Sequence, residues 1–411
     1  MNQAAGSVAE LQGLYGSYSF SEYLLQKIWL RGDFDRSRAL TAEGERIEIV
    51  HPGRWNKLGG PDFLGARIRF GAKPEVTGDV ELHLHEEDWA AHKHEVDPAY
   101  DRVVLHVVLF PRSEGSAAKA MNMRRIPVLA LLALLQHDLE EFAADEAIER
   151  MAARPSGLIF ETLSMMSPAA LDACLRSAAG LRWRQKVHYA RLRIERLGWA
   201  EACHTSALEI LGYRFNRAAM LRVAGKFPLE TWTEKDLLAD EILASEHGHW
   251  QVQGVRPANH PRSRLDQYRR WVQADADWPQ RLSELAGSWP QVSAEQGTRA
   301  LRAEHGFGAL RARLAETCCG SALSGTRLDT FVIDGALPLV AAQCRNEAEI
   351  FGSWFHWFPG DLPPTVSQTL KDLSVSGVAV GQSAINGFAQ GILGWWWQRD
   401  ANSRGPLRKL P

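Results

Sequence analysis

The sequence predicts an α/β domain, in which helices flank a mixed sheet, followed by a mostly α-helical domain. Residues 47–110 hold short, β-branched and mostly alternating segments, which are typical of strands. Beyond residue 157 the apolar residues recur at helical spacing. A chain of 411 residues also exceeds what one hydrophobic core usually supports. We therefore expect domains at 1–150 and 151–411, with a C-terminal helical subdomain from about residue 325.

The first domain should begin with a helix over residues 21–29, for which Ser19 or Ser21 is available as the N-cap. Four strands follow, and the last is almost wholly apolar, which predicts the centre of the sheet. The segment 86–99 is long enough for a helical crossover to a parallel strand, and residues 126–144 complete the α/β unit. The predicted strands are 47–50, 66–70, 80–84 and 103–110.

The second domain follows a linker at residues 154–157 and reads as a succession of amphipathic helices. A final helical stretch ends in three consecutive tryptophans, 395–397. The predicted helices are 168–178, 180–197, 199–211, 216–226, 235–246, 262–275, 277–287, 294–303 and 306–317.

Composition excludes several classes of function. The formal net charge of −2 gives no overall attraction to a polyanion, so a nucleic-acid contact requires a local patch. The longest apolar run, 126–135, is too short to span a membrane, and residues 1–7 lack the features of a secretory signal. We therefore expect a cytoplasmic protein with no membrane partner. The five cysteines show no C-x-x-C spacing, and the sequence gives no indication of oligomeric state.

Acidic and histidine residues concentrate between Pro61 and His106. If a strand over 62–70 pairs with one over 79–85, Asp62 falls opposite His83 and within two positions of Glu81. Alternation along the second strand places Glu81, His83 and His85 on one face. Because carboxylates at one spot repel unless a cation lies between them, this hairpin predicts a divalent-metal site.

The spacing Pro-Asp-x(18)-Glu-x-His resembles the signature of the PD-(D/E)XK superfamily of metal-dependent nucleases, whose fold is restriction-endonuclease-like. The resemblance covers roughly residues 1–150. It implies that Asp62, Glu81 and the carbonyl of Leu82 bind Mg²⁺ or Mn²⁺, and that the protein hydrolyses nucleic-acid phosphodiesters. Glu22, on the first predicted helix, corresponds to the accessory glutamate of that superfamily.

His83 stands where the superfamily has lysine, and imidazole is a good ligand for softer ions. We therefore count His83 with Asp62 and Glu81 as a candidate ligand and catalytic residue, with Zn²⁺ as a further candidate ion. Two alternatives to a nuclease stay open. One is a non-catalytic scaffold that binds nucleic acid or protein. The other is a small-substrate metallohydrolase, which requires His83 and His85 to converge with His92 or His94.

The other histidines have simpler interpretations. His92 and His94 diverge if they lie on a helix, so we expect supporting or surface roles for them. His106 lies inside an apolar strand and is expected to be a hydrogen-bonded core residue.

A second resemblance, spread over most of the chain, is to an uncharacterised bacterial family of unknown function. It implies no activity. The residues that carry it are Trp55-Asn56, Gly59-Gly60-Pro61-Asp62-Phe63, Gly78-Asp79-Val80-Glu81-Leu82-His83, Asp88-Trp89, His92-x-His94, Leu105-His106-Val107-Val108, Leu211-Gly212-Tyr213 with Asn216, and Arg256-Pro257-Ala258-Asn259.

One basic cluster stands out in the helical region and is accompanied by Trp183, His188 and Tyr189. Charged runs usually form a solvated helix face, but basic and aromatic side chains together also suit a nucleic-acid backbone. The candidate contacts to nucleic acid are Arg182, Arg184, Lys186 and Arg191.

Overall fold

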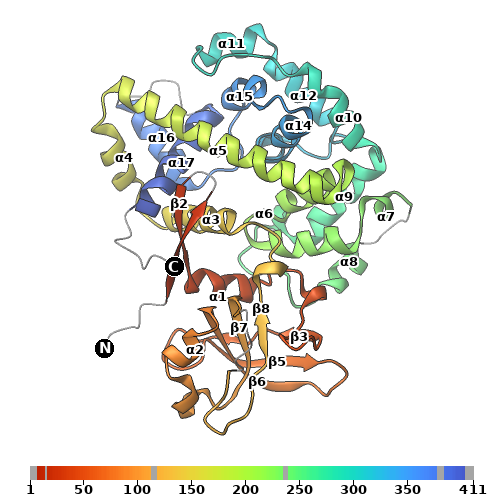
Figure 1. The fold of residues 1–411 in the computed structure, drawn as a ribbon. Coiled ribbons are helices and arrows are strands. Elements are labelled where there is room, and N and C mark those ends of the chain that lie inside the picture. Colours follow the sequence, from red (N-terminus) through yellow and green to blue (C-terminus); the bar gives the residue numbers. More distant parts are fainter. Residues whose placement is uncertain (1–6, 14–15, 113–117, 235–238, 377–383, 403–411) are drawn as a thin grey trace. The chain divides into compact units, whose positions relative to one another are not determined.

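The computed structural model describes residues 7–13, 16–112, 118–234, 239–376 and 384–402. The chain divides into two compact units (Figure 1). Unit 1 comprises residues 1–146 with 401–411, and unit 2 comprises residues 147–400. Unit 1 holds the described strands and unit 2 is built from helices, so the predicted fold class is confirmed.

A six-stranded mixed sheet forms the body of unit 1, with strand order β3-β5-β6-β7-β8 and β4 paired to β5. The β3, β4, β5 and β6 pairings are antiparallel, whereas β6–β7 and β7–β8 are parallel. A separate two-stranded ladder, absent from the sequence prediction, pairs β1 with β2. The strands are β1 (Val8–Gly13), β2 (Gly16–Ser21), β3 (Ile47–His51), β4 (Arg54–Trp55), β5 (Phe63–Phe70), β6 (Val76–His85), β7 (Val103–Phe110) and β8 (Val128–Ala130).

The four predicted strands all exist, but the prediction of the sheet centre was wrong. The apolar strand β7 lies one position from the edge, and β6 is central. β7 is almost fully buried because both of its faces are covered: Leu105, Val107 and Leu109 lie in the main core, and His106 and Val108 on the other face are also fully buried. Burial of both faces, and not a central position, therefore explains its composition.

The predicted first helix is α1 (Glu22–Arg31). The Ser21 side chain accepts a hydrogen bond from the Leu24 backbone N–H, and Gly32 ends the helix in the left-handed conformation. Apolar residues on one face of α1 pack into the core that includes β5, β6 and β7. Because α1 packs against β6, its residues lie next to the central strand.

The β5–β6 hairpin contains a bulge between Phe63 and Ala66. Gly65 sits in it with a φ of +67°, and its backbone N–H donates to Asp79 Oδ1 at 2.9 Å. Phe63 pairs with Val80, so Asp62 comes opposite Glu81 and not opposite His83 as predicted. The prediction missed the bulge and assumed the wrong register, which together displace the pairing by two residues.

The crossover between β6 and β7 is made of short helical turns: α2 (Asp88–Ala91), η2 (His94–Val96) and η3 (Pro98–Tyr100). Trp89 and Tyr100 anchor it in a small second core with Val103 and Ile126. After β8, the turn η4 (Leu132–Leu134) leads into α3 (Leu139–Ala152). Near the start of the chain, η1 (Arg36–Arg38) connects α1 to β3.

Unit 2 contains the predicted helices. In two cases, a pair of helices predicted separately is one continuous helix. Predicted helices 168–178 and 180–197 form α5, and 199–211 and 216–226 form α6, which has non-helical backbone at Tyr213 and Asn216. Residues 235–238 of one predicted helix lie outside the described residues. The helices are α4 (Ser156–Ser164), α5 (Pro168–Leu197), α6 (Trp199–Lys226), α7 (Leu229–Glu234), α8 (Ala239–Ser245), η5 (Pro257–Asn259), α9 (Pro261–Ala274), α10 (Trp278–Glu284), η6 (Leu285–Ser288), α11 (Thr298–Glu304), α12 (Phe307–Thr317), α13 (Gly325–Phe331), η7 (Val332–Ala336), α14 (Leu337–Cys344), α15 (Glu347–His356), α16 (Pro364–Val375) and α17 (Asn386–Asn402).

The three tryptophans near the C-terminus lie buried on α17. Trp396 Nε1 donates to the Ala147 carbonyl at 3.1 Å, and the Arg154 guanidinium lies 5.1 Å from the centre of its ring. These residues therefore serve the packing of unit 2. Among the described residues, no helix combines the length and apolar character needed to cross a bilayer.

Candidate metal centre

Glu81 and His83 lie on the central strand β6, with side chains on the same face. Both are buried: His83 is 0% exposed and Glu81 is 5% exposed. The sheet thus holds a carboxylate and an imidazole away from water. Such groups are stable only with a hydrogen-bond partner, a proton or a cation.

Asp62 contacts Glu81 through its backbone. Its N–H donates to Glu81 Oε2 at 2.9 Å, while its own carboxylate accepts two hydrogen bonds. Asp62 Oδ1 accepts from Gln26 Nε2 at 2.6 Å, and Oδ2 accepts from the Leu82 N–H at 3.0 Å. Both Asp62 oxygens are therefore engaged, and these bonds fix the orientation of Glu81.

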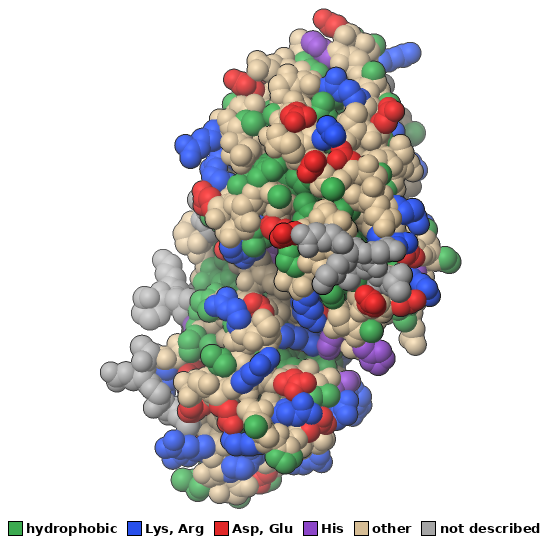
Figure 2. Space-filling view, turned by 90° about the vertical axis from the view of Figure 1, so that its right-hand side faces the viewer, with side chains coloured by type: hydrophobic (Ala, Val, Ile, Leu, Met, Phe, Trp, Pro, Cys, Tyr) green, Lys and Arg blue, Asp and Glu red, His purple; other side chains and the backbone are tan. Residues whose placement is uncertain are grey.

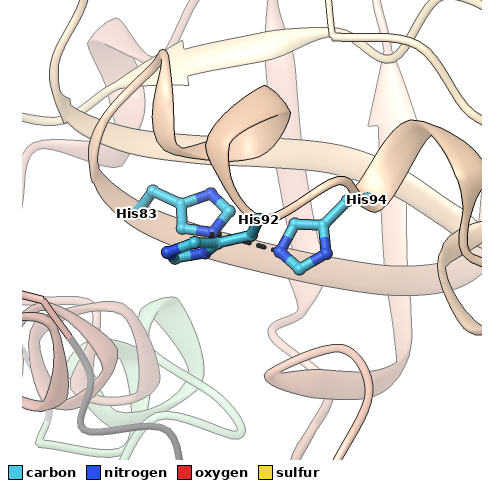
Figure 3. Close-up of side chains that lie close together, drawn as sticks. All are labelled: His83, His92 and His94. Atoms are coloured by element: carbon cyan, nitrogen blue, oxygen red, sulfur yellow. Dashed lines mark hydrogen bonds between the residues drawn. The ribbon is translucent and has the colours of Figure 1, made fainter.

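Three histidines converge on one point beside Glu81 (Figure 3). His83 Nε2 lies 3.1 Å from His92 Nδ1 and 3.3 Å from His94 Nε2. Glu81 Oε1 lies 3.5 Å from His83 Nε2 and 3.4 Å from His94 Nε2. One nitrogen cannot form good hydrogen bonds with three such neighbours at once, so a common ligand explains the arrangement better.

The prediction that His92 and His94 have supporting or surface roles stays a prediction, but both rings lie beside His83. The helix α2 ends at Ala91, and Lys93 takes a left-handed conformation with a φ of +61°. This reversal turns both neighbouring imidazoles onto β6. His94 is buried against Tyr100, with ring centres 3.7 Å apart, whereas His92 is exposed. Solvent, and an ion dissolved in it, can therefore reach the cluster from the side of His92.

The spacing of the donor atoms fits a tetrahedral ion. Ligand atoms placed 2.0–2.1 Å from a zinc-type ion at the corners of a tetrahedron lie about 3.4 Å apart. His83 Nε2 lies 3.1 Å from His92 Nδ1, 3.3 Å from His94 Nε2 and 3.5 Å from Glu81 Oε1, and His94 Nε2 lies 3.4 Å from Glu81 Oε1. These four separations, all of which involve His83 or His94, fit a divalent transition metal in both spacing and chemistry.

Burial lowers the pKa values of the two buried histidines of the group, His83 and His94. It holds the pKa of His83 well below its usual value, reinforced by His106, His94 and His92. Burial likewise lowers the pKa of His94. Neutral imidazoles retain the lone pairs that a metal needs.

The pKa values of the carboxyl groups are raised instead of lowered. Burial, followed by the charges of Glu81 and Glu22, raises the pKa of Asp62 to about 9. Burial and the charge of Glu22 raise the pKa of Glu81 well above its usual value. Acids that resist ionisation beside neutral imidazoles indicate a site that lacks positive charge, which a cation would supply.

Glu22 begins α1 and is buried. Its Oε2 accepts hydrogen bonds from the Ser7 N–H at 2.9 Å and the Ser7 Oγ at 3.2 Å. It forms a second possible ligand group with Glu81 and His83, whose donor atoms all lie within 4.8 Å of one another. Burial raises the pKa of Glu22, which makes it a better proton acceptor near neutral pH.

The sequence prediction missed Gln26, which orients Asp62. Gln26 lies four residues after Glu22 and therefore on the same helix face, a signal that was available in the sequence. Its Oε1 accepts from Trp55 Nε1 at 3.0 Å. Asn56 Nδ2 in turn donates to the Pro61 carbonyl at 2.9 Å, so residues 55–56 hold the loop that carries Asp62.

His106 lies on β7 and is fully buried, as expected of a core residue. Its Nε2 lies 2.9 Å from His83 Nδ1. If His83 presents Nε2 to an ion, its Nδ1 carries the proton and donates it to His106, which fixes the ring. Burial, aided by His94, lowers the pKa of His106 to about 3.

The predicted ligand set and the clustered set differ in part. Glu81 and His83 are in both, and Glu22 lies close to them. Asp62 belongs to neither ligand group in the described part of the chain. His85 stacks on Phe110 with ring centres 5.1 Å apart, and it too lies outside the histidine group.

The predicted nucleic-acid residues of unit 2 make contacts within that unit. Arg182 is buried and its Nε donates to Gln390 Oε1 at 2.8 Å. Lys186 lies 2.7 Å from Asp334, and Arg191 lies 3.3 Å from Glu347. Arg184 is exposed. On the face drawn in Figure 2, Lys and Arg side chains are interspersed with Asp and Glu side chains.

A family model matches residues 22–244, more than half of the chain, and its description is Protein of unknown function (DUF2851). The resemblance to a family of unknown function is thereby confirmed, although the motif at residues 256–259 lies beyond the match. No curated protein and no solved structure matches the chain. The resemblance to the PD-(D/E)XK superfamily stays a prediction.

Proposed function

Because the chain belongs to DUF2851, a protein family of unknown function, we propose its function from its own site: metal-dependent hydrolysis of nucleic-acid phosphodiesters. The ion would be held by Glu81 and by His83, His92 and His94. Glu22 would be the accessory acidic residue that accepts a proton, and Asp62 would position Glu81.

The convergence of four donor atoms carries the metal part of this proposal. His83 Nε2 lies 3.1 to 3.5 Å from His92 Nδ1, His94 Nε2 and Glu81 Oε1, although these atoms come from a strand and from the crossover that follows it. Packing alone gives no reason to gather three imidazoles beside a buried carboxylate. A divalent cation does give such a reason.

The order of elements supports a phosphodiester substrate. A helix that carries Glu22 precedes a hairpin that carries Asp62 and Glu81, and a crossover then leads to the parallel strand β7. This is the arrangement that the resemblance to PD-(D/E)XK nucleases implies. The substrate assignment is therefore carried by an analogy of fold, whereas the metal assignment is carried by the site.

The donor set favours Zn²⁺ over Mg²⁺, because Mg²⁺ prefers oxygen ligands and three of the four donors here are nitrogens. Such an ion supplies Lewis-acid activation of water and neutralises charge on a phosphoryl group. Glu22 takes up the proton that the attacking water loses, since its raised pKa makes it a stronger base than a free glutamate. Asp62 and Gln26 keep Glu81 in place.

The first experiment measures the metal. Purified full-length protein is analysed by elemental mass spectrometry, and Zn²⁺ and Mn²⁺ binding to the metal-free protein is titrated. We expect about one ion per chain, and at least a tenfold loss of affinity in His94→Ala and Glu81→Gln. His85→Ala is the matched control, because His85 lies on the same strand outside the cluster. Equal affinity in all variants would refute the metal centre.

The second experiment measures cleavage of single-stranded, duplex and branched DNA and of RNA, with Mg²⁺, Mn²⁺ or Zn²⁺. We expect cleavage with Mn²⁺ or Zn²⁺, and a loss of at least 100-fold in Glu22→Gln with the metal still bound. Metal binding without cleavage of any of these substrates would overturn the nuclease assignment and leave a binding scaffold.

The second candidate is a metallohydrolase of small substrates. The convergence of His83, His92 and His94 favours it, and so do the internal partners of Arg182, Lys186 and Arg191, which reduce the charge offered to a polyanion. Hydrolysis of bis(4-nitrophenyl) phosphate that depends on Glu81, together with intact oligonucleotides, would select this candidate.

A further inference from the structure

Two arginines of unit 2, Arg327 buried and Arg264 half-buried, have incomplete hydrogen bonding. Arg327, on α13, is 9% exposed. Its Nη1 donates to the Ile210 carbonyl at 3.1 Å, and its Nη2 lies 3.1 Å from Asp361 Oδ2. Its Nε is buried and has no hydrogen-bond partner among the described residues. A buried N–H group without an acceptor is energetically unfavourable.

Arg264, on α9, has only neutral acceptors in the described part of the chain. Its Nη1 donates to Gln267 Oε1 at 2.6 Å, and its Nη2 donates to Asn259 Oδ1. The Arg264 Nε is likewise buried without a partner. Arg264 therefore carries a positive charge that no carboxylate here binds directly.

The charges of this cluster do not balance. Burial, reinforced by the charge of Arg327 and opposed by that of Asp361, lowers the pKa of Arg264 to about 10. Both guanidinium groups stay protonated at neutral pH, against the single carboxylate of Asp361. That carboxylate is shared, because Thr326 Oγ1 also donates to it at 2.9 Å. One positive charge is left over.

Tyr213 covers this cluster from α6. The Arg327 guanidinium lies 4.6 Å from the centre of the Tyr213 ring. The Tyr213 backbone has a φ of 52° and a ψ of −162°, a conformation that is strained for a non-glycine residue. Asn216 holds the turn by exchanging hydrogen bonds of 2.8 and 3.0 Å with the Gln251 backbone.

These residues also explain motifs that the metal centre leaves unused. Tyr213 and Asn216 belong to one sequence motif, and Asn259 closes another. The structure joins the two motifs at Arg264 and Arg327, where strain, charge and unsatisfied donors coincide.

We propose that Arg264 and Arg327, covered by Tyr213, form a binding site for a phosphate group. A phosphate supplies the missing negative charge and acceptor oxygens for the guanidinium donors, whose planar fork matches it. Both Nε atoms are shielded from water, so the ligand reaches them when the strained Tyr213 turn shifts. The site lies in unit 2 and does not depend on the function proposed for unit 1.

The test is calorimetric titration of the full-length protein with inorganic phosphate. We expect binding by the wild type and at least a tenfold weaker Kd in Arg264→Gln. Arg262→Gln is the matched control, because Arg262 lies on the same helix, is exposed and pairs with Asp240 at 2.9 Å. Arg327→Lys keeps the charge but loses the fork, and we expect it to weaken binding as well.

Competition identifies the source of the phosphate. A single-stranded oligonucleotide that displaces inorganic phosphate would assign the site to nucleic acid. Phosphate binding that the oligonucleotide leaves unchanged would assign it to a free phosphate or a small phosphoester. The proposal is overturned if the wild type binds no phosphate at about 10 mM, or if Arg264→Gln and Arg262→Gln bind it equally. Circular dichroism confirms that each variant is folded.

Discussion

His83 uses its two ring nitrogens for different purposes. Its Nδ1 contacts His106 Nε2 at 2.9 Å, which leaves Nε2 for the cluster of donors. A histidine whose far nitrogen is held by a neighbour has a fixed tautomer and a fixed ring plane. The lysine expected here from the nuclease signature offers no lone pair while charged, so His83 changes which ions the site accepts.

The first prediction concerns His106→Gln in the metal-free protein. The folded-state pKa of His106 lies near 3, below its ordinary 6.5, so its neutral form stabilises the fold above pH 6.5. That stability is lost as the pH falls from 6.5 toward 3. Glutamine does not titrate, so the stability gap between wild type and variant should shrink by about 2 kcal/mol between pH 7 and pH 5.

This prediction can be checked by urea unfolding, read out by hydrogen exchange in peptides of β7. His51→Gln is a suitable control, because His51 is an exposed histidine at the end of β3. A stability gap that stays constant between pH 7 and pH 5 would show that His106 is not held neutral by burial.

The second prediction concerns protons released on metal binding. The raised pKa of Glu81 means that its carboxyl keeps its proton to a higher pH than a free glutamate does in the metal-free protein. A metal takes the carboxylate form, so binding should release protons from Glu81, and Glu81→Gln should release fewer. Calorimetry in two buffers of different ionisation enthalpy measures this number, and equal release by both proteins would contradict it.

At the scale of elements, the bulge in β5 sets the geometry of the site. Gly65 occupies a left-handed conformation, and Asp79 holds its N–H. Without the extra residue in β5, every pair beyond it would shift, and Asp62 would no longer face Glu81.

The third prediction uses Gly65→Ala. A Cβ at Gly65 meets open space, so the substitution costs only the left-handed backbone, about 1 kcal/mol. We also expect weaker metal binding. Loss of the left-handed conformation at residue 65 would shift the pairing of β5 with β6 and move Asp62 away from Glu81. Gly59→Ala is the control, since Gly59 has open space and an ordinary φ. Thermal unfolding and metal titration would distinguish them, and equal behaviour would contradict a role for the bulge.

The elements could be predicted from the sequence, whereas their register and long-range contacts could not. The run 103–110 is apolar enough to mark a strand, and Ser21 marks the start of a helix. The conformation of Lys93, which brings His92 to the site, leaves no trace in residue types because lysine rarely adopts it. Arg191 pairs with a residue 156 positions away, a distance that no local pattern encodes.

At the scale of the whole molecule, the two units carry different candidate sites. The metal centre lies within unit 1, and the arginine cluster lies within unit 2. Ligands that bind only the folded form stabilise it in proportion to their saturation. Each ligand should therefore stabilise its own unit most.

The fourth prediction tests this separation by hydrogen exchange. An ion at 100 times its Kd should stabilise its unit by about 2.7 kcal/mol. We expect peptides of β6 and β7 to gain protection with Zn²⁺, and peptides of α9 and α13 to gain it with phosphate. Addition of a chelator should reverse only the first effect. Equal protection of both units by either ligand would contradict separate sites.

The order of the donors along the chain has a consequence for the speed of folding. Glu81, His83, His92 and His94 lie within one continuous segment, which closes a loop of about ten residues in well under a microsecond. The parallel pairing of β6 with β7 forms more slowly, because its ends must first be brought together. An ion that gathers these donors early would preform the crossover and hasten that pairing, so the metal would act as a folding nucleus before it acts as a cofactor.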